Sequence, residues 1–285
     1  MFTSESVTEG HPDKLCDQIS DAIIDQFLRR DPFARAIAEC AVSTGIVFIS
    51  ARFESDAIVD FTKIARQAIK QAGYEEPDFN AKTCSIITSL KELPPNKQRY
   101  VDEKQLSEAE IEQIPVQDQV TVFGFACNQT AALMPLPIWL AHQLAKRLTV
   151  LRLEKIVPYL APDGKIQVGV EYCDRQPSRI HSITILASLD KLAASDAPDC
   201  KQLQKEIRET AIDFVFQNRS IKPDEKTRIL IDFDDPFAIG GPAVHSGLTG
   251  RKNAIDTYGE YARHSGAALS GKETTRINRV GAYAA

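Results

Sequence analysis

The order of the hydrophobic patterns limits the folds open to this chain more than any single motif does. One succession, a helix followed by a hairpin, a second helix and a strand, occurs twice, and the second copy starts about 120 residues after the first. In the first copy the predicted elements are a helix over 13–30, a hairpin over 34–54 that turns at Thr44 and Gly45, a helix over 57–72 and a buried strand over 83–90. In the second copy they are a strand over 120–128, a helix over 135–155, a hairpin over 166–189, a helix over 199–216 and a strand over 227–233.

This succession predicts an α+β fold, in which helices cover one face of each antiparallel-rich sheet. The repetition indicates an internal duplication of structural subdomains. A third subdomain is expected to begin near Arg276 and to be incomplete where the sequence stops at Ala285. We therefore expect an N-terminal domain over 1–97, a mobile lid or linker over 98–118, a central domain over 119–232 and the start of a truncated C-terminal domain over 233–285.

The connection at residues 91–118 is polar and charged and contains three prolines. A connection of this length is uncommon in a compact domain and is usually a functional lid or a disordered segment. We favour a mobile lid, and we expect the stretch SEAEIEQ within it to form a turn of helix.

The composition excludes several classes of protein. Charged residues make up 26% of the chain and hydrophobic residues 43%, as in ordinary globular proteins, and the net charge of −5 offers no electrostatic footprint for nucleic acid. The first ten residues lack the features of a signal peptide, and no apolar run reaches the roughly twenty residues that span a bilayer. Six scattered cysteines without a C-x-x-C pair are expected to be reduced packing residues. These observations predict a cytoplasmic protein that binds neither nucleic acid nor membranes.

Residues 239–272 hold seven of the fourteen glycines, with Arg251, Lys252, Arg263 and Lys272 among them. Glycines let a backbone approach a ligand closely, and neighbouring cations neutralise phosphate oxygens. A solvated, turn-rich connector is the alternative interpretation. The concentration of such features in one stretch favours a polyphosphate site.

Within this stretch, Gly266 to Lys272 has the spacing G-x-x-x-x-G-K of a P-loop. The next residue is Glu273, so the hydroxyl that would bind magnesium is missing. A P-loop NTPase is therefore disfavoured.

The N-terminal run SESVTEGHPDKLCDQ concentrates acidic and basic residues around His11. On its own this run reads as the charged entry to a helix, with Asp13 complementing the helix dipole and His11 structural. Beside a polyphosphate site it has a second interpretation, since a carboxylate can hold Mg²⁺ while His and Lys contact oxygens of a leaving group.

The runs FTSESVTEGHPDK, GLTGRK, the DTYG that follows it and SGK resemble the S-adenosylmethionine synthetase (methionine adenosyltransferase) family, and the similarity extends from Phe2 to Ala285. The resemblance implies repeated α+β subdomains, homodimers or homotetramers with active sites between subunits, and the use of ATP, methionine, Mg²⁺ and K⁺. It also implies the reaction: the methionine sulfur attacks C5′ of ATP to form S-adenosylmethionine, and the released triphosphate is hydrolysed to pyrophosphate and phosphate.

The resemblance assigns expected roles to individual residues. Catalysis is expected of His11, Lys165, Arg251 and Lys272, and ATP binding of His11, Lys14, Asp118, Asp163, Gly164, Lys165, Pro236, Phe237, Arg251, Lys252, Ala268 and Lys272. The methionine or a related thioether is expected to contact Gln98, His245 and Arg276, while Asp13 holds Mg²⁺ and Glu39 is associated with K⁺. A thioether is nucleophilic without deprotonation, so the first step needs converging cations for the leaving group rather than a general base.

The chain departs from the family pattern at several positions. Arg52 and His245 stand where the family has acids for the methionine ammonium, Asn278 replaces a metal-associated acid, and Arg276 replaces a lysine. The leading prediction is a methionine adenosyltransferase. Two alternatives stay open: a non-catalytic or altered-substrate relative that binds ATP or triphosphate but not methionine, and a stand-alone ATP or triphosphate hydrolase.

Overall fold

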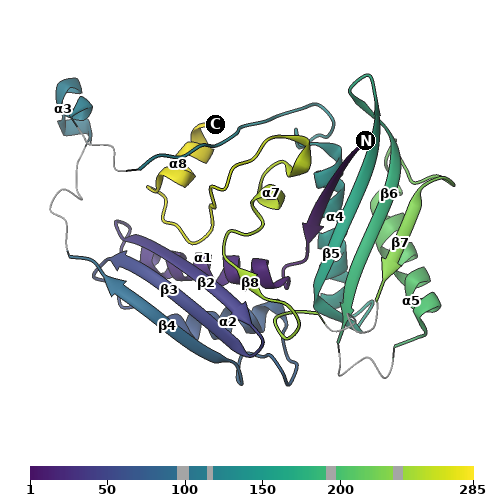
Figure 1. Cartoon of the computed structure of the whole chain (residues 1–285), viewed down its shortest axis with the longest axis horizontal. Helices are drawn as coiled ribbons and strands as arrows, with labels where there is room; N and C mark the ends of the chain where they lie inside the picture. Colours follow the sequence, from purple (N-terminus) through teal and green to yellow (C-terminus); the bar gives the residue numbers. More distant parts are fainter. Residues whose placement is uncertain (95–102, 114–117, 191–196, 234–239) are drawn as a thin grey trace.

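The computed structural model describes residues 1–94, 103–113, 118–190, 197–233 and 240–285. Its strands form two four-stranded sheets, and the segments that carry α7 and α8 run between the two (Figure 1). Helices and antiparallel-dominated sheets together confirm the predicted α+β class. None of the described helices combines the length and the hydropathy needed to cross a membrane.

The N-terminal sheet has the strand order β4-β3-β2-β8. Its strands are β2 (Arg35–Ser43), β3 (Ile46–Glu54), β4 (Ser85–Glu92) and the short β8 (Gly247–Leu248). β2 and β3 form the predicted antiparallel hairpin, and Thr44 adopts the left-handed conformation, φ 52°, at its tight turn. β4 pairs with β3 in parallel, because a helix carries the chain back along the sheet before β4 begins.

Two helices cover one face of this sheet. α1 (Pro12–Arg30) has proline in its first turn and is N-capped by His11, while α2 (Phe61–Ala72) is N-capped by Asp60 and ends at Gly73 with φ 92°. Their apolar faces pack on the inner faces of β2 and β3. Fully inaccessible members of this core include Leu15, Ile19, Ile23, Val47, Ile49 and Ile69.

The central sheet has the strand order β1-β5-β6-β7. Its strands are β1 (Phe2–Val7), β5 (Leu160–Cys173), β6 (Gln176–Leu189) and β7 (Arg228–Asp232). β5 and β6 form the second predicted hairpin, with Asp174 and Arg175 both at positive φ in the turn. β7 pairs with β6 in parallel, as β4 does with β3.

A long helix and a composite helix cover this second sheet. α4 (Leu136–Leu153) is followed after the hairpin by α5 (Cys200–Ile207), the π-helix η4 (Arg208–Asp213) and α6 (Phe214–Phe216). Fully inaccessible members of the core between helices and sheet include Leu144, Leu151, Ile166, Val168, Ile183, Ile185, Ile207 and Ile212. The predicted order of helix, hairpin, helix and strand is thus confirmed in both copies.

Each sheet receives one strand from a distant part of the chain. β1 completes the central sheet by pairing with β5 from Phe2↔Val170 to Val7↔Lys165. β8 completes the N-terminal sheet by pairing with β2 at only two positions, Ala41↔Leu248 and Val42↔Gly247. The segments that enter and leave these exchanged strands meet between the two sheets (Figure 1).

The prediction of a strand over 120–128 is wrong. The described backbone of 118–128 pairs with no strand and runs past α8 (Ile277–Ala284), where a Cβ on Gly281 would touch Val120 and Val122 (Figure 1). β1 takes the position beside β5 in the central sheet, so this apolar segment does not pair with β5.

Three local features also differ from expectation. The predicted buried strand at 83–90 forms as β4 but is largely exposed, because it is the edge strand and lies beyond the helices. The helix predicted from residue 57 begins at Phe61, after the Asp60 cap. The helix predicted over 199–216 contains the π-helical stretch, which periodicity at 3.6 residues per turn does not signal.

The part of the predicted lid that the structure describes contains the 3₁₀ turn η2 (Glu103–Gln105) and α3 (Glu108–Glu112). A capping box between Ser107 and Glu110 starts α3, which confirms the helical turn expected in SEAEIEQ. The C-terminal part adds α7 (Asn253–Asp256), the 3₁₀ turn η5 (Gly259–Tyr261) and α8.

Candidate active site

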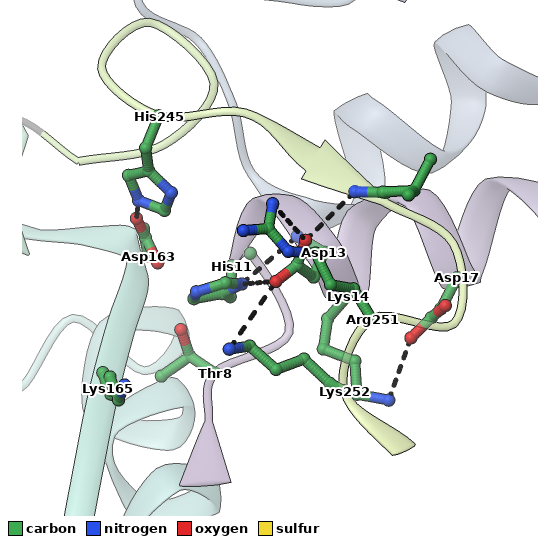
Figure 2. A network of polar contacts seen from close by, with 12 residues as sticks. Thr8, His11, Asp13, Lys14, Asp17, Asp163, Lys165, His245, Arg251 and Lys252 are labelled. Carbon is green, nitrogen blue, oxygen red and sulfur yellow. Dashed lines mark hydrogen bonds and ion pairs between the residues drawn. The ribbon is translucent and has the colours of Figure 1, made fainter. Parts of the chain in front are cut away.

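Three segments far apart in the sequence meet where the sheets exchange strands: the loop between β1 and α1, the start of β5, and the loop after β8 (Figure 2). Their backbones approach so closely that a Cβ on Gly10 would overlap Pro162, and one on Gly247 would overlap the backbone of Pro12. The Thr8 hydroxyl fixes the first contact by donating to the Pro162 carbonyl oxygen at 2.6 Å.

Three cations of this region share two carboxylates. Lys165 Nζ lies 2.5 Å from Glu5 Oε2, and Lys252 Nζ lies 3.4 Å from Glu5 Oε1 and 3.7 Å from Asp13 Oδ2. Arg251 is more exposed, with Nη1 3.9 Å from Asp13 Oδ1. Although burial opposes it, Lys165 and Lys252 hold the pKa of Glu5 below its ordinary value. We call Glu5, Asp13, Lys165, Arg251 and Lys252 the first charged cluster.

Two acids on α1 hold the loop after β8 in place. Asp13 Oδ1 accepts from the Leu248 N–H at 3.0 Å, and Asp17 Oδ1 accepts from the Gly250 N–H at 2.7 Å. Lys14 Nζ donates to Asp17 Oδ2 at 3.1 Å and pairs with Asp256. Burial raises the pKa of Asp17 above its ordinary value, against the opposing effects of Lys14 and the Gly250 N–H. The phosphate-binding loop predicted from the glycines is therefore fixed to α1 by buried carboxylates.

The position of His11 is compatible with both interpretations of the sequence, a structural residue at the start of α1 and a side chain that contacts the leaving group. Its Nδ1 accepts from the Asp13 N–H at 3.2 Å and so caps α1. Only 8% of the residue is exposed, and burial lowers its pKa to about 4 against the opposing charges of Asp163 and Asp13. The imidazole is therefore neutral at pH 7, and no hydrogen bond of the described residues uses its Nε2.

Asp163 ties the start of β5 to the loop before β8. Its Oδ2 accepts from the Gly241 N–H at 2.7 Å and from His245 Nε2 at 2.7 Å. Asp163 is buried, whereas the His245 side chain is 43% exposed, and the ring centroids of His11 and His245 lie 5.3 Å apart. Figure 2 shows the Asp163 and His245 side chains close together, with the His11 ring between Asp163 and Asp13.

A second charged group surrounds Lys272 and contains Glu39, Asp118 and Arg276. Partial burial lowers the pKa of Lys272, while the charges of Glu39 and Asp118 oppose this and that of Arg276 adds to it. The Lys272 Nζ donates to the Ala268 carbonyl oxygen at 2.6 Å. These charges lie close enough to influence one another, which the sequence alone did not indicate.

Backbone pairing places this second group on the N-terminal sheet. Lys272 forms a bridge with Ile37 on β2, and Asp21 of α1 accepts from the Gly271 N–H at 2.7 Å. Glu39 follows Ile37 on the same face of β2, and Arg52 is the β3 partner of Ile37. Glu39 and Arg52 are both exposed on the face of this sheet that α1 and α2 leave uncovered.

Among the described residues, no hydrogen bond or ion pair joins the first charged cluster to the second group. The residues expected from the sequence to meet one substrate thus form two groups, whose backbones approach each other where a Cβ on Gly250 would lie 2.4 Å from the Cβ of Ala268. Gln98, Pro236 and Phe237 lie outside the described residues. Sequence reasoning gave no role to Glu5, Asp17 and Asp256, although all three belong to the charge-rich runs that it had singled out.

Comparison with known proteins identifies relatives along the whole chain. Sequence models of the S-adenosylmethionine synthetase N-terminal, central and C-terminal domains match residues 1–95, 113–237 and 239–285, respectively. The chain is 45% identical to the S-adenosylmethionine synthase of Thermosynechococcus vestitus over 296 aligned positions, which cover 100% of this chain and 71% of that protein. It is 44% identical to the enzyme of the same name from Gloeothece citriformis and 45% identical to that from Trichormus variabilis, with 70% of each protein covered.

Proposed function

Because the chain belongs to the S-adenosylmethionine synthetase family, we propose that it is a methionine adenosyltransferase, which forms S-adenosylmethionine from ATP and methionine with release of phosphate and pyrophosphate. The observation that supports this most directly is the meeting of Lys165, Arg251 and Lys252 beside His11 and Asp13, although they come from three distant segments. The comparisons do not favour the alternative of a relative that binds ATP or triphosphate but not methionine.

In this proposal the first charged cluster receives the triphosphate of ATP. Lys165, Arg251 and Lys252 are now paired with carboxylates, and their N–H groups can turn to phosphate oxygens when a polyanion enters. Charge develops on the triphosphate as its bond to C5′ breaks, so cations already held in place stabilise the transition state. His11 is neutral, and its Nε2 can donate a hydrogen bond to a leaving oxygen without adding a charge before ATP binds.

Mg²⁺ and K⁺ are the proposed cofactors. Asp13 fits the first, because Oδ1 is occupied by the Leu248 N–H while Oδ2 faces Lys252 and makes no hydrogen bond to the described residues. Mg²⁺ is commonly held by one or two carboxylates together with substrate phosphates, and bound there it would neutralise phosphate charge. The exposed carboxylate of Glu39, in the second group, is the proposed oxygen ligand for K⁺.

We also propose that the complete site forms between two copies of the chain. The uncovered face of the N-terminal sheet exposes apolar side chains, of which Ile46, Phe48, Ile87 and Leu248 are each more than 40% exposed. The second group lies on this same face. Burying the apolar patch in a homodimer would bring the second group of one copy towards the first charged cluster of its partner.

Product analysis tests the reaction. The full chain, incubated with ATP and methionine, is expected to yield S-adenosylmethionine, phosphate and pyrophosphate, measured by mass spectrometry and phosphate assay. Lys252→Ala should lose activity, whereas Lys201→Ala, an exposed lysine on α5, should not. Phosphate released without an adenosylated product would instead support the stand-alone hydrolase.

Subunit complementation tests the shared site. His11→Ala and Lys272→Ala are each expected to inactivate a homodimer. Dimers reassembled from an equal mixture should regain roughly a quarter of the activity, because half of them are mixed and each mixed dimer has one intact site. No recovery, despite mixed dimers detected by mass spectrometry, would place both residues in a site within one chain.

A further inference from the structure

Two histidines and an aspartate meet at one edge of the first charged cluster. His11 comes from the loop before α1, Asp163 from β5, and His245 from the loop before β8. Each offers a ligand atom, and these atoms all lie within 4.8 Å of one another. Figure 2 shows the Asp163 and His245 side chains pointing towards each other, with the His11 ring beside them.

The surroundings hold two of the three side chains in place. His11 and Asp163 are only 8% and 6% exposed. Asp163 is fixed by the Gly241 N–H, and the loop comes so close that a Cβ on Gly240 would lie 2.7 Å from Asp163 Oδ2. His245 is the adjustable member, since its side chain is 43% exposed. Two fixed ligands and one adjustable ligand suit an ion that completes the site on binding.

We propose that His11, Asp163 and His245 form a three-ligand site for a zinc-type transition metal ion. Two imidazole nitrogens and one carboxylate oxygen are a ligand set that Zn²⁺ and Co²⁺ accept, with a fourth position left for water or a ligand oxygen. Mg²⁺ prefers oxygen ligands alone and does not compete well for such a set. The proposed function places its oxygen-bound cations at Asp13 and Glu39, but it also uses His11, so a metal ion bound at the new site would compete with ATP for this ring.

The geometry requires only small adjustments. Metal–ligand distances of about 2.0–2.2 Å place tetrahedral ligand atoms roughly 3.3 Å apart. The His245 Nε2 to Asp163 Oδ2 distance of 2.7 Å would open slightly, and the three ligand atoms, which all lie within 4.8 Å of one another, would need to move by no more than about 1.5 Å. Asp163 keeps its hydrogen bond from Gly241 as support for the bound carboxylate.

Asp13 supplies the outer partner that a metal-bound histidine needs. His11 binds the ion through Nε2, and its proton then lies on Nδ1, which is 3.8 Å from Asp13 Oδ2. A carboxylate in this place orients the ring and increases its basicity. The Asp13 N–H to Nδ1 hydrogen bond, which keeps the ring proton on Nε2 in the metal-free chain, is given up in exchange.

Titration with Co²⁺ tests the proposal, because four-coordinate Co²⁺ absorbs visible light and six-coordinate aqueous Co²⁺ does so only weakly. The full chain carries Cys173→Ser and Cys200→Ser, which remove the exposed thiols as competing ligands. We expect one Co²⁺ per chain with a four- or five-coordinate spectrum that Zn²⁺ abolishes and excess Mg²⁺ does not. His245→Ala should weaken binding by at least ~100-fold, the upper range for loss of a group that only supports a ligand.

His264→Ala is the matched control, since it removes an exposed histidine outside the cluster and should leave the affinity within about twofold. Circular dichroism establishes that each variant is folded. Absence of the spectrum in the parent chain would overturn the proposal. So would a folded His245→Ala variant that binds Co²⁺ as tightly as the parent does.

Discussion

The two exchanged strands differ in what holds them. We call the contact of each exchanged strand with its sheet a join. β1 pairs with β5 over its whole length, so backbone hydrogen bonds between the two strands provide most of the β1 join. β8 pairs with β2 at two positions only, and side chains add further contacts: Asp13 accepts from the Leu248 N–H, Asp17 from the Gly250 N–H, and Thr249 Oγ1 from the Cys40 N–H. The β1 join is therefore part of the global fold, whereas the β8 join can open locally.

This difference separates stability from ligand binding. The β1 join places His11 and Glu5 firmly, and the β8 join carries Arg251 and Lys252. We expect damage to the β1 join to lower the free energy of unfolding of the whole chain. Damage to the β8 join should mainly release the cations, and therefore weaken polyphosphate binding.

The largest effects are expected from substitutions of Gly10 and Gly247, each of which lies where two backbone segments approach closely. Gly10→Ala should lower the free energy of unfolding by about 3 kcal/mol, the upper end for overpacking, because the new methyl overlaps the backbone and ring of Pro162. Gly247→Ala overlaps the backbone of Pro12 but should be relieved by lifting of the β8 segment, with a smaller loss of stability and a larger loss of tripolyphosphate affinity.

Urea unfolding and calorimetric titration with tripolyphosphate and Mg²⁺ measure the two effects. Gly266→Ala is the control, since a Cβ there meets nothing within 4 Å. Equal losses of stability in Gly10→Ala and Gly247→Ala would contradict the proposed difference between the β1 join and the β8 join.

Asp17→Ala should act almost entirely on the β8 join. It removes the acceptor of the Gly250 N–H and one partner of Lys14, a loss of about 2 kcal/mol. Thermal unfolding and tripolyphosphate titration should show weaker binding together with this destabilisation. Asp25→Ala, an exposed acid on the same helix, should change either quantity by less than ~0.5 kcal/mol.

A threonine hydroxyl secures each join, which allows a direct comparison. Thr249 Oγ1 accepts from the Cys40 N–H at 2.9 Å, so Thr249→Val leaves a buried donor without this partner and should cost ~2 kcal/mol. Thr8 donates to the Pro162 carbonyl oxygen at 2.6 Å, and Thr8→Val should cost ~1 kcal/mol, because an under-satisfied carbonyl is better tolerated. Chemical denaturation of both variants measures the difference, and the reverse order would contradict it.

The smallest effects concern the pH dependence of stability, where Glu5 and Asp17 should act in opposite directions. The pKa of Glu5 is lowered in the folded chain, so its contribution is present above the unfolded value near 4.5 and is lost as pH falls through the folded pKa. The pKa of Asp17 is raised, so its contribution is greatest below the unfolded value near 3.8 and is lost as pH rises through the folded pKa.

The variants Glu5→Gln and Asp17→Asn separate these contributions. Unfolding free energies measured between about pH 3 and 7 should show a shallower loss on acidification for Glu5→Gln. For Asp17→Asn the loss on acidification should be steeper, because the group that opposed it has been removed. Parallel profiles for the two variants would show that the carboxylates do not titrate in opposite directions.

Much of the fold was predictable because local patterns determine it. The periodicity of 13–30, the Thr44 turn and the Gly73 cap each appear in the structure at or near the expected place. The prediction of a strand at 120–128 was wrong, because an apolar stretch can form either a strand or an extended segment packed on a helix. For the site, the structure brings His11, Asp13, Lys165, Arg251 and Lys252 together, while their roles stay predictions.

By itself, the sequence determined the two helix–hairpin–helix–strand units, their caps and turns, and the presence of a run of glycines and cations for which we predict phosphate binding. Each of these depends on neighbours within a few residues, so periodicity and residue type suffice to specify it. Only the tertiary structure decided that β1 and β8 exchange sheets, that Lys272 pairs with β2 beside Glu39, and that His245 meets Asp163. These outcomes depend on which sheet edges remain open and which loops approach closely, and contacts between such distant residues leave no local pattern in one sequence.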